Sequence, residues 1–247
     1  MRAAATKAEL AIVFAEKWSN ESDDQPDLGL GAEQDTLIEA VASGNPRTVV
    51  VLETGNPVLM PWLSKVPAVL EAWYPGQRGA EAIVNVLSGR VNPSGHLPVT
   101  WPAGTDQLPF QELPGWSAPR ADAATRKAVG YQADRSPFTI QYPEGVDVGY
   151  RWYQRKGTTP LFPFGHGLSY TAFRYDQIQV SGGRSLKVSF RVTNTGQREA
   201  ADVTGGSCAC CQPCSTMVWR QSRRPPARRC WRASRRRHHP QHPGATS

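Results

Sequence analysis

Three short apolar runs, separated by amphipathic segments, constrain the fold of this chain more than any other feature. They span Leu10–Ala15, Thr48–Glu53 and Ala68–Trp73. The first is rich in branched residues, which predicts a strand that is buried on both faces; the second is predicted to be another buried strand and the third a further strand. Apolar residues at helical spacing follow in Glu33–Ser43 and Gly79–Leu87. This alternation predicts an α/β fold with a mostly parallel sheet and helices on both faces.

Three loops are expected at one edge of that sheet. In parallel sheets, functional groups gather beyond the carboxyl ends of the strands. The acidic loop Trp18–Gly31 follows the first strand, Thr54–Pro57 follows the second and Tyr74–Gln77 follows the third. A short helix is predicted over Val58–Ser64, and residues 92–170, rich in Pro, Gly and aromatic residues, are expected to form long loops that aromatic side chains pin to the core.

A second, all-β region is predicted near residue 173. Phe173–Val180 and Leu186–Thr193 alternate apolar and polar residues, as half-exposed strands do, and Asn194–Gly196 supplies a turn. Since a β-sandwich of this kind needs about seven strands, residues 173–204 predict an incomplete all-β sandwich.

The composition changes abruptly at residue 205. Residues 205–247 hold nine arginines without any acidic residue, so residues 1–204 carry −2 of the total net charge of +7. All five cysteines also lie in this tail, at positions 208, 210, 211, 214 and 230. We expect the tail to be disordered and the product of an out-of-frame reading; the alternatives are nucleic-acid binding by its arginines and a zinc site formed by its cysteines with His238 and His239.

Several classes of protein are excluded at this point. The chain has no run of about eighteen apolar residues, so we expect no membrane span. Lys7 and Glu9 interrupt the first apolar stretch, which is not a signal peptide, and the compartment stays open. His96 and His166, each beside glycine, are interpreted as packed and hydrogen-bonded residues rather than catalytic ones.

Four motifs carry a family resemblance. VVVLETGNPVLMPWL, AWYPGQRGAEAIVNVLSGRVNPSGHLPVTWP, EGVDVGYRWY and PLFPFGHGLSYTAFRY, in this order, resemble glycoside hydrolase family 3, the β-glucosidase and β-xylosidase group. The resemblance covers roughly residues 5–200. It implies that residues 1–172 form the family's C-terminal α/β sandwich domain, truncated at its N-terminal side, that residues 173–204 begin a fibronectin-III-like domain, and that 205–247 are the tail.

The resemblance also implies a mechanism. The family hydrolyses O-glycosyl bonds in β-linked oligosaccharides or aryl β-glycosides with retention and without a metal or other cofactor. Its nucleophilic aspartate lies on a (β/α)8 barrel, so no nucleophile is expected in this chain and the missing barrel is its implied partner. The general acid/base lies in a stretch resembling GE-x-x-DR, which carries that role onto Glu21; Gln25 stands where the family has an arginine.

The chemistry of the acidic loop agrees with that assignment. A general acid must still hold its proton near neutral pH, so its pKa must be raised. Crowding of Glu21 by Asp23, Asp24 and Asp27 would raise its pKa, because like charges disfavour ionisation. Trp18, three residues earlier, is expected to stack on a sugar ring. The alternative is a solvated acidic loop without a catalytic role. Three hypotheses for the function follow. The chain is the acid/base part of a β-glucosidase-like enzyme, a non-catalytic carbohydrate-binding or scaffold module or inactive fragment, or a nucleic-acid-binding protein. We adopt the first and expect neither nucleic acid nor a membrane as a partner.

Overall fold

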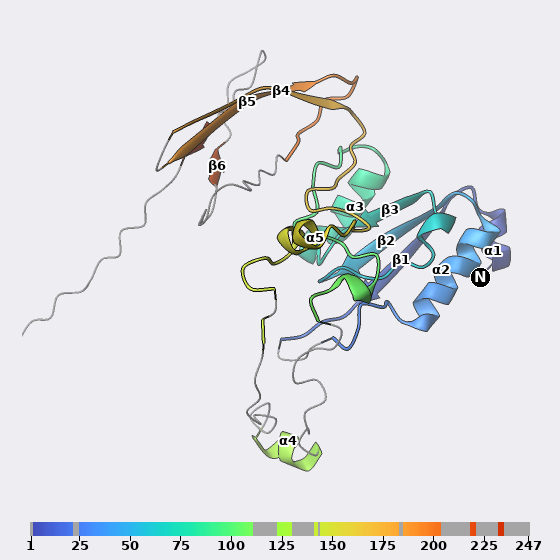
Figure 1. Ribbon diagram of the computed structural model, residues 1–247. Helices are drawn as coiled ribbons and strands as arrows, with labels where there is room; N and C mark the ends of the chain where they lie inside the picture. Colours follow the sequence, from blue (N-terminus) through green and yellow to red (C-terminus); the bar gives the residue numbers. More distant parts are fainter. Residues whose placement is uncertain are drawn as a thin grey trace, which may run out of the picture. The chain divides into compact units, whose positions relative to one another are not determined.

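The computed structural model of the 247-residue chain describes most of residues 2–203 and two short strands beyond them (Figure 1). The described residues are 2–21, 25–110, 123–129, 141–142, 144–182, 185–203, 218–220 and 232–234. They fall into two compact units: one combines Met1–Ser88 with His96–His166, and the other combines Gly89–Gly95 with Gly167–Ser247.

The described part of the first unit holds three strands, which are β1 (Ala11–Lys17), β2 (Thr48–Thr54) and β3 (Ala68–Glu71). Its α-helices are α1 (Arg2–Lys7), α2 (Ala32–Gly44), α3 (Gly79–Leu87), α4 (Ala123–Val129) and α5 (Tyr150–Lys156). Single 3₁₀ turns occur at η1 (Leu63–Lys65), η2 (Gly76–Arg78) and η3 (Thr105–Gln107).

The three strands form one parallel sheet in the order β1-β2-β3. Its register pairs Lys17 with Thr54 at the carboxyl ends of β1 and β2, and Leu52 with Glu71 at the end of β3. Helix α2 packs on β1 and β2, with α1 beside it (Figure 1). The carboxyl ends of neighbouring strands therefore meet at one edge, as parallel pairing requires.

The core of this unit lies between α2 and one face of the sheet. Val13 of β1, Val50 of β2 and Ile38 of α2 belong to one buried cluster, which Trp62 and Trp101 extend. Each indole is anchored by a hydrogen bond, because Trp62 donates its N–H to Asp35 Oδ1 at 2.8 Å and Trp101 donates to the Val58 carbonyl at 2.7 Å. The first bond ties Trp62 to α2, and the second ties Trp101 to the segment that follows β2.

The expectation that the first strand is buried on both faces is wrong. β1 is an edge strand, and its side chains alternate: Val13 and Ala15 are buried, whereas Ile12 and Phe14 are 42% and 54% exposed. Only β2, which has a partner on each side, buries consecutive residues, with Val50, Val51 and Leu52 all at 0% exposure. An unbroken apolar run does not by itself distinguish an edge strand from a central one.

Two element boundaries also differ from those predicted. The strand expected over Ala68–Trp73 ends at Glu71, because Trp73 has a φ of 53° and turns the backbone out of the sheet. The helix expected over Val58–Ser64 is only the 3₁₀ turn η1, since Pro61 has no amide hydrogen to donate to a helical turn.

The second unit contains an antiparallel pair, β4 (Phe173–Gly182) with β5 (Leu186–Asn194), with an irregularity between Asp176 and Gln179. It also contains the short antiparallel pair β6 (Val218–Arg220) with β7 (Arg232–Ser234). The predicted fold class, a parallel sheet with helices followed by antiparallel strands, is confirmed. Apart from β6 and β7, the predicted disordered tail lies outside the described residues, and so do all five cysteines.

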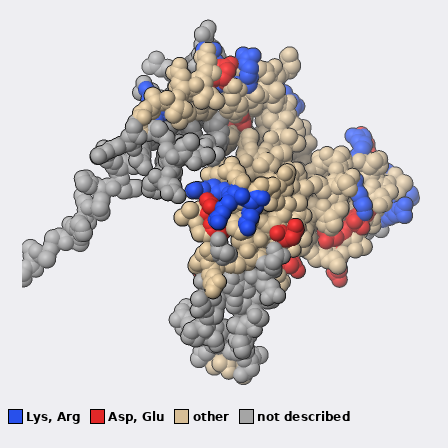
Figure 2. Space-filling view, viewed as in Figure 1, with Lys and Arg blue, Asp and Glu red and all other residues tan. Residues whose placement is uncertain are grey.

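Charges of both signs are interspersed on the surface. Figure 2 shows acidic side chains among the basic ones over the described residues of the face in view. Among the helices that the structure describes, none is long and apolar enough to cross a membrane.

Candidate active site

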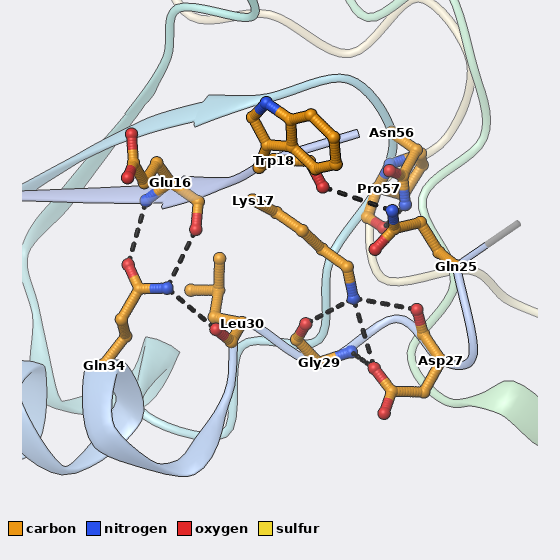
Figure 3. A network of polar contacts seen from close by, with 10 residues as sticks. All are labelled: Glu16, Lys17, Trp18, Gln25, Asp27, Gly29, Leu30, Gln34, Asn56 and Pro57. Carbon is orange, nitrogen blue, oxygen red and sulfur yellow. Dashed lines mark hydrogen bonds and ion pairs between the residues drawn. The ribbon is translucent and has the colours of Figure 1, made fainter. Parts of the chain in front are cut away.

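The loop that carries Glu21 begins and ends at the carboxyl edge of the sheet. It leaves β1 after Lys17 and returns to α2 at Ala32. Residues 22–24, which include Asp23 and Asp24, lie outside the described residues. The two ends of the loop are described in full, and polar contacts join them (Figure 3).

Lys17 holds the returning end of this loop. Its Nζ donates to the carbonyl oxygens of Asp27 and Gly29 at 2.8 and 2.5 Å, and it lies 3.1 Å from Asp27 Oδ1 (Figure 3). Only 10% of the lysine side chain is exposed, whereas 65% of the Asp27 side chain is. The ammonium group therefore fixes two backbone carbonyls from inside the loop, as a charge-assisted clamp.

Asp27 belongs to the same clamp as Lys17. Its Oδ1 accepts the Gly29 amide hydrogen at 2.8 Å as well as the Lys17 contact. The Gly29 hydrogen bond and then the Lys17 ammonium group hold the pKa of Asp27 below its usual value of 3.8. The Asp27 carboxylate is therefore paired at the base of the loop, and its predicted influence on Glu21 stays a prediction.

Two glutamine side chains close the same loop. Gln25 donates an Nε2 hydrogen to the Trp18 carbonyl at 3.2 Å, so the segments on either side of Glu21 are joined (Figure 3). Gln34 of α2 pairs with the Glu16 backbone, accepting its N–H at 2.9 Å and donating to its carbonyl at 2.8 Å. Gln34 thus occupies the backbone N–H and C=O groups of Glu16 on the free edge of β1, where a further strand would otherwise pair.

Glu21 and Trp18, the two predicted site residues, both lie exposed on this loop. Glu21 follows the end of β1 by four residues, and Trp18 is 69% exposed on the segment before it. The structure places them on one loop beyond the carboxyl end of a parallel strand, where functional groups of such sheets gather. Their roles stay predictions.

A second carboxylate at this edge, Glu71, was not identified from the sequence. Burial raises the pKa of Glu71 to about 7 from its usual 4.5, although hydrogen bonds from Trp73 and Thr54 favour the charged form. The Trp73 amide donates to Glu71 Oε1 at 2.8 Å, and the Thr54 hydroxyl lies 3.4 Å from Oε2. A lone acidic residue at the end of an apolar strand was the available signal.

Tyr74, from the loop after β3, was also missed as a site residue. Its hydroxyl donates to the Lys17 carbonyl at 2.7 Å and lies 2.8 Å from Ser19 Oγ. The prediction that the loops after the first and third strands share one edge is confirmed by these contacts.

The two histidines agree with their structural interpretation. His96 Nδ1 lies 2.7 Å from the Gly165 carbonyl oxygen, and the His166 ring stacks on Phe162 with 4.7 Å between centroids. Within the described residues, no group of three or more His, Cys, Asp and Glu side chains is placed to hold a metal ion. The zinc alternative falls on tail residues outside the described part.

The chain belongs to glycosyl hydrolase family 3. Residues 1–170 match the family model for the glycosyl hydrolase family 3 C-terminal domain. The family resemblance seen in the sequence is confirmed.

Its relatives are β-glucosidases. The chain is 42% identical to a β-glucosidase of Rhizobium radiobacter over 207 residues, which cover 81% of this chain and 23% of the relative. It is 39% identical to the thermostable β-glucosidase B of Acetivibrio thermocellus, covering 81% of this chain and 25% of that protein. Among solved structures, it resembles DesR, a β-glucosidase from Streptomyces venezuelae in complex with D-glucose, with 44% identity and a TM-score of 0.64 over 80% of this chain and 24% of DesR. The chain spans about a quarter of the length of these relatives.

Proposed function

We propose that this chain is the acid/base-bearing part of a retaining β-glucosidase-like enzyme, and that Glu21 is its general acid/base. The observation that carries the proposal is the placement of Glu21 on a loop clamped at the carboxyl edge of the sheet, in a domain whose relatives are β-glucosidases. The substrate class is a β-linked oligosaccharide or an aryl β-glycoside.

In this mechanism Glu21 acts twice. As an acid it gives a proton to the glycosidic oxygen while a carboxylate nucleophile attacks the anomeric carbon, and the aglycone leaves as an alcohol. As a base it then takes a proton from the water that hydrolyses the glycosyl-enzyme intermediate. The nucleophile belongs to the family's barrel domain, and neither step requires a metal or an organic cofactor.

Trp18 is the proposed sugar-binding residue on the same loop. Its exposed indole offers an apolar face for stacking, three residues before Glu21. Its backbone carbonyl is held by Gln25, so the segment that carries the indole is tied at its base.

The match to the family model also supports two proposed domain limits. The family match ends at residue 170 and β4 begins at Phe173, which supports an α/β sandwich domain over 1–172 and the start of a fibronectin-III-like domain over 173–204. The tail, 205–247, is proposed to have no part in the reaction.

The test is a hybrid enzyme in which residues 1–203 replace the matching segment of the Rhizobium radiobacter β-glucosidase. In this hybrid we expect Glu21→Gln to lower kcat/KM on an alkyl β-glucoside by about 10²–10⁴-fold, the usual contribution of general acid catalysis. On a 2,4-dinitrophenyl β-glucoside, whose leaving group needs no proton, kcat/KM should fall by less than about fivefold.

Glu33→Gln is the matched control, because Glu33 is an exposed glutamate in the first turn of α2. It should leave both substrates unaffected. Full activity of Glu21→Gln on the alkyl substrate would disprove the assignment of Glu21 and favour the non-catalytic alternative for this loop.

A further inference from the structure

Tyr74 joins the loop after β3 to the segment that leads into Glu21. Its hydroxyl lies 2.7 Å from the Lys17 carbonyl oxygen and 2.8 Å from Ser19 Oγ. A phenol has one proton, and the Lys17 carbonyl can only accept it, so Ser19 must donate its own proton to the Tyr74 oxygen. The two bonds fix both the backbone and a side chain within four residues of Glu21.

The close approach of Tyr74 depends on Gly55, which follows β2. A Cβ at position 55 would lie 2.9 Å from Tyr74 Cε2, 3.0 Å from its hydroxyl oxygen and 3.1 Å from Ser19 Oγ. Real Cβ atoms essentially never lie within 3.0 Å of another heavy atom, so a side chain at position 55 would displace the phenol ring. Loops from three consecutive parallel strands thus meet at the Tyr74 hydroxyl.

The direction of Tyr74 is set by its neighbour Trp73. Trp73 has a φ of 53°, a left-handed conformation that is costly for a bulky residue. Its amide hydrogen bonds to Glu71 Oε1 at 2.8 Å, and its ring lies 6.2 Å from that of the buried Trp101. Backbone strain of this kind persists where the surroundings hold it, and it clusters at functional sites.

We infer that Tyr74 is a positioning residue for Glu21: by holding the Lys17 carbonyl and the Ser19 hydroxyl, it fixes where the acid/base loop leaves the sheet. This inference rests on the proposed role of Glu21. A general acid acts only within hydrogen-bond reach of the leaving oxygen, and a shift of about 1 Å can cost about 100-fold in rate. Tyr74 itself takes no part in proton transfer to the substrate.

The kinetic test uses Tyr74→Phe in the hybrid enzyme, which keeps the ring and removes the hydroxyl. We expect kcat/KM to fall about 10–100-fold on the alkyl β-glucoside and less than threefold on the 2,4-dinitrophenyl β-glucoside. A merely structural role would lower both in proportion, because less folded enzyme would act on either substrate. Tyr142→Phe, at an exposed tyrosine away from these loops in the sequence, is the matched control and should change neither.

Two results separate this inference from the proposed function. Suppose that Glu21→Gln loses activity on the alkyl substrate, whereas Tyr74→Phe either keeps its activity or loses activity on both substrates equally. The positioning role of Tyr74 is then wrong, and the role of Glu21 stands. If Glu21→Gln keeps full activity, both are wrong.

Hydrogen exchange in the full 247-residue chain keeps the inference testable without a working hybrid. Tyr74→Phe should raise the exchange rates of the amides at residues 18–20 by at least about tenfold, since the bonds that hold this segment closed are lost. Gly55→Ala should have the same effect, and Tyr142→Phe should have none. Unchanged exchange at residues 18–20 in Tyr74→Phe would overturn the inference.

Discussion

A single ammonium group, that of Lys17, holds the base of the loop that carries Glu21. Lys17→Met removes the group that donates hydrogen bonds to two backbone carbonyls and one carboxylate. We therefore expect the free energy of unfolding to fall by about 1–3 kcal/mol. Lys65→Met, which breaks the more exposed ion pair with Glu39, should cost only about 0–1 kcal/mol. Urea denaturation of the two variants measures the difference, and equal losses would contradict the clamp.

Glu71 predicts how stability depends on pH. Its pKa is raised to about 7 in the folded chain, against 4.5 for an ordinary glutamate, so the folded chain binds this proton more tightly than the unfolded chain does. Its contribution to stability is therefore complete below about pH 4.5 and is lost as the pH rises through about 7.

Glu71→Gln tests this pH dependence while keeping an oxygen that can accept the Trp73 amide hydrogen. Between pH 5 and pH 8 we expect the variant to lose less stability than the unsubstituted chain. One pKa unit corresponds to about 1.4 kcal/mol, so the difference should be about 1–3 kcal/mol after allowance for partial exposure. Glu81→Gln, at an exposed glutamate of α3, should retain the unsubstituted pH dependence. Identical slopes for Glu71→Gln and the unsubstituted chain would show that Glu71 is not the titrating group.

At the scale of elements, apolar periodicity predicted strands β1 to β5 and helices α2 and α3, whereas β6 and β7 lie in the tail, where no strand was predicted. The helix predicted over Gly79–Leu87 is observed with those bounds, and the second strand differs by one residue. Apolar periodicity does not tell which strands pair with one another. The edge position of β1 and the exposure of Phe14 could therefore not be anticipated.

The site was predictable only in part, for a similar reason. The order of strands and loops placed Glu21 at the correct edge, because loop position follows from the strand pattern. The contacts of Tyr74 and Glu71 depend instead on where the backbone turns at Trp73, and that turn is stabilised by residues from other segments. Local patterns do not contain such information.

The start of α3 gives a prediction at this scale. A Cβ at Gly79 would lie 2.5 and 2.7 Å from Pro75 Cγ and Cβ, so the 3₁₀ turn η2 can meet α3 only because position 79 has no side chain. Gly79→Ala should destabilise the chain by roughly 1–3 kcal/mol despite the better helix propensity of alanine. Gly95→Ala, where a Cβ would meet nothing within 4 Å, should be close to neutral. Thermal unfolding of the pair measures this, and a neutral Gly79→Ala would contradict the packing described.

At the scale of the whole molecule, the part of the chain that matches its relatives covers only about a quarter of their length. If the nucleophile belongs to a barrel domain, the purified 247-residue chain should hydrolyse an aryl β-glucoside no faster than a Glu21→Gln sample of the same chain. Turnover at enzyme-like rates, about 1 s⁻¹ or more, would contradict the proposed division of the catalytic groups. Release of the aryl alcohol over time is the measurement.

The same division predicts what a small anion does in the hybrid enzyme when Glu21 is removed. In Glu21→Ala, azide needs no general base and can attack the glycosyl-enzyme directly, forming a carbon–nitrogen bond and releasing the nucleophilic carboxylate. With the 2,4-dinitrophenyl β-glucoside we therefore predict that azide restores kcat and that the product is β-glucosyl azide, with retained configuration. If Glu21→Ala turns over as fast as the unsubstituted hybrid and azide yields no glycosyl azide, Glu21 is not the acid/base.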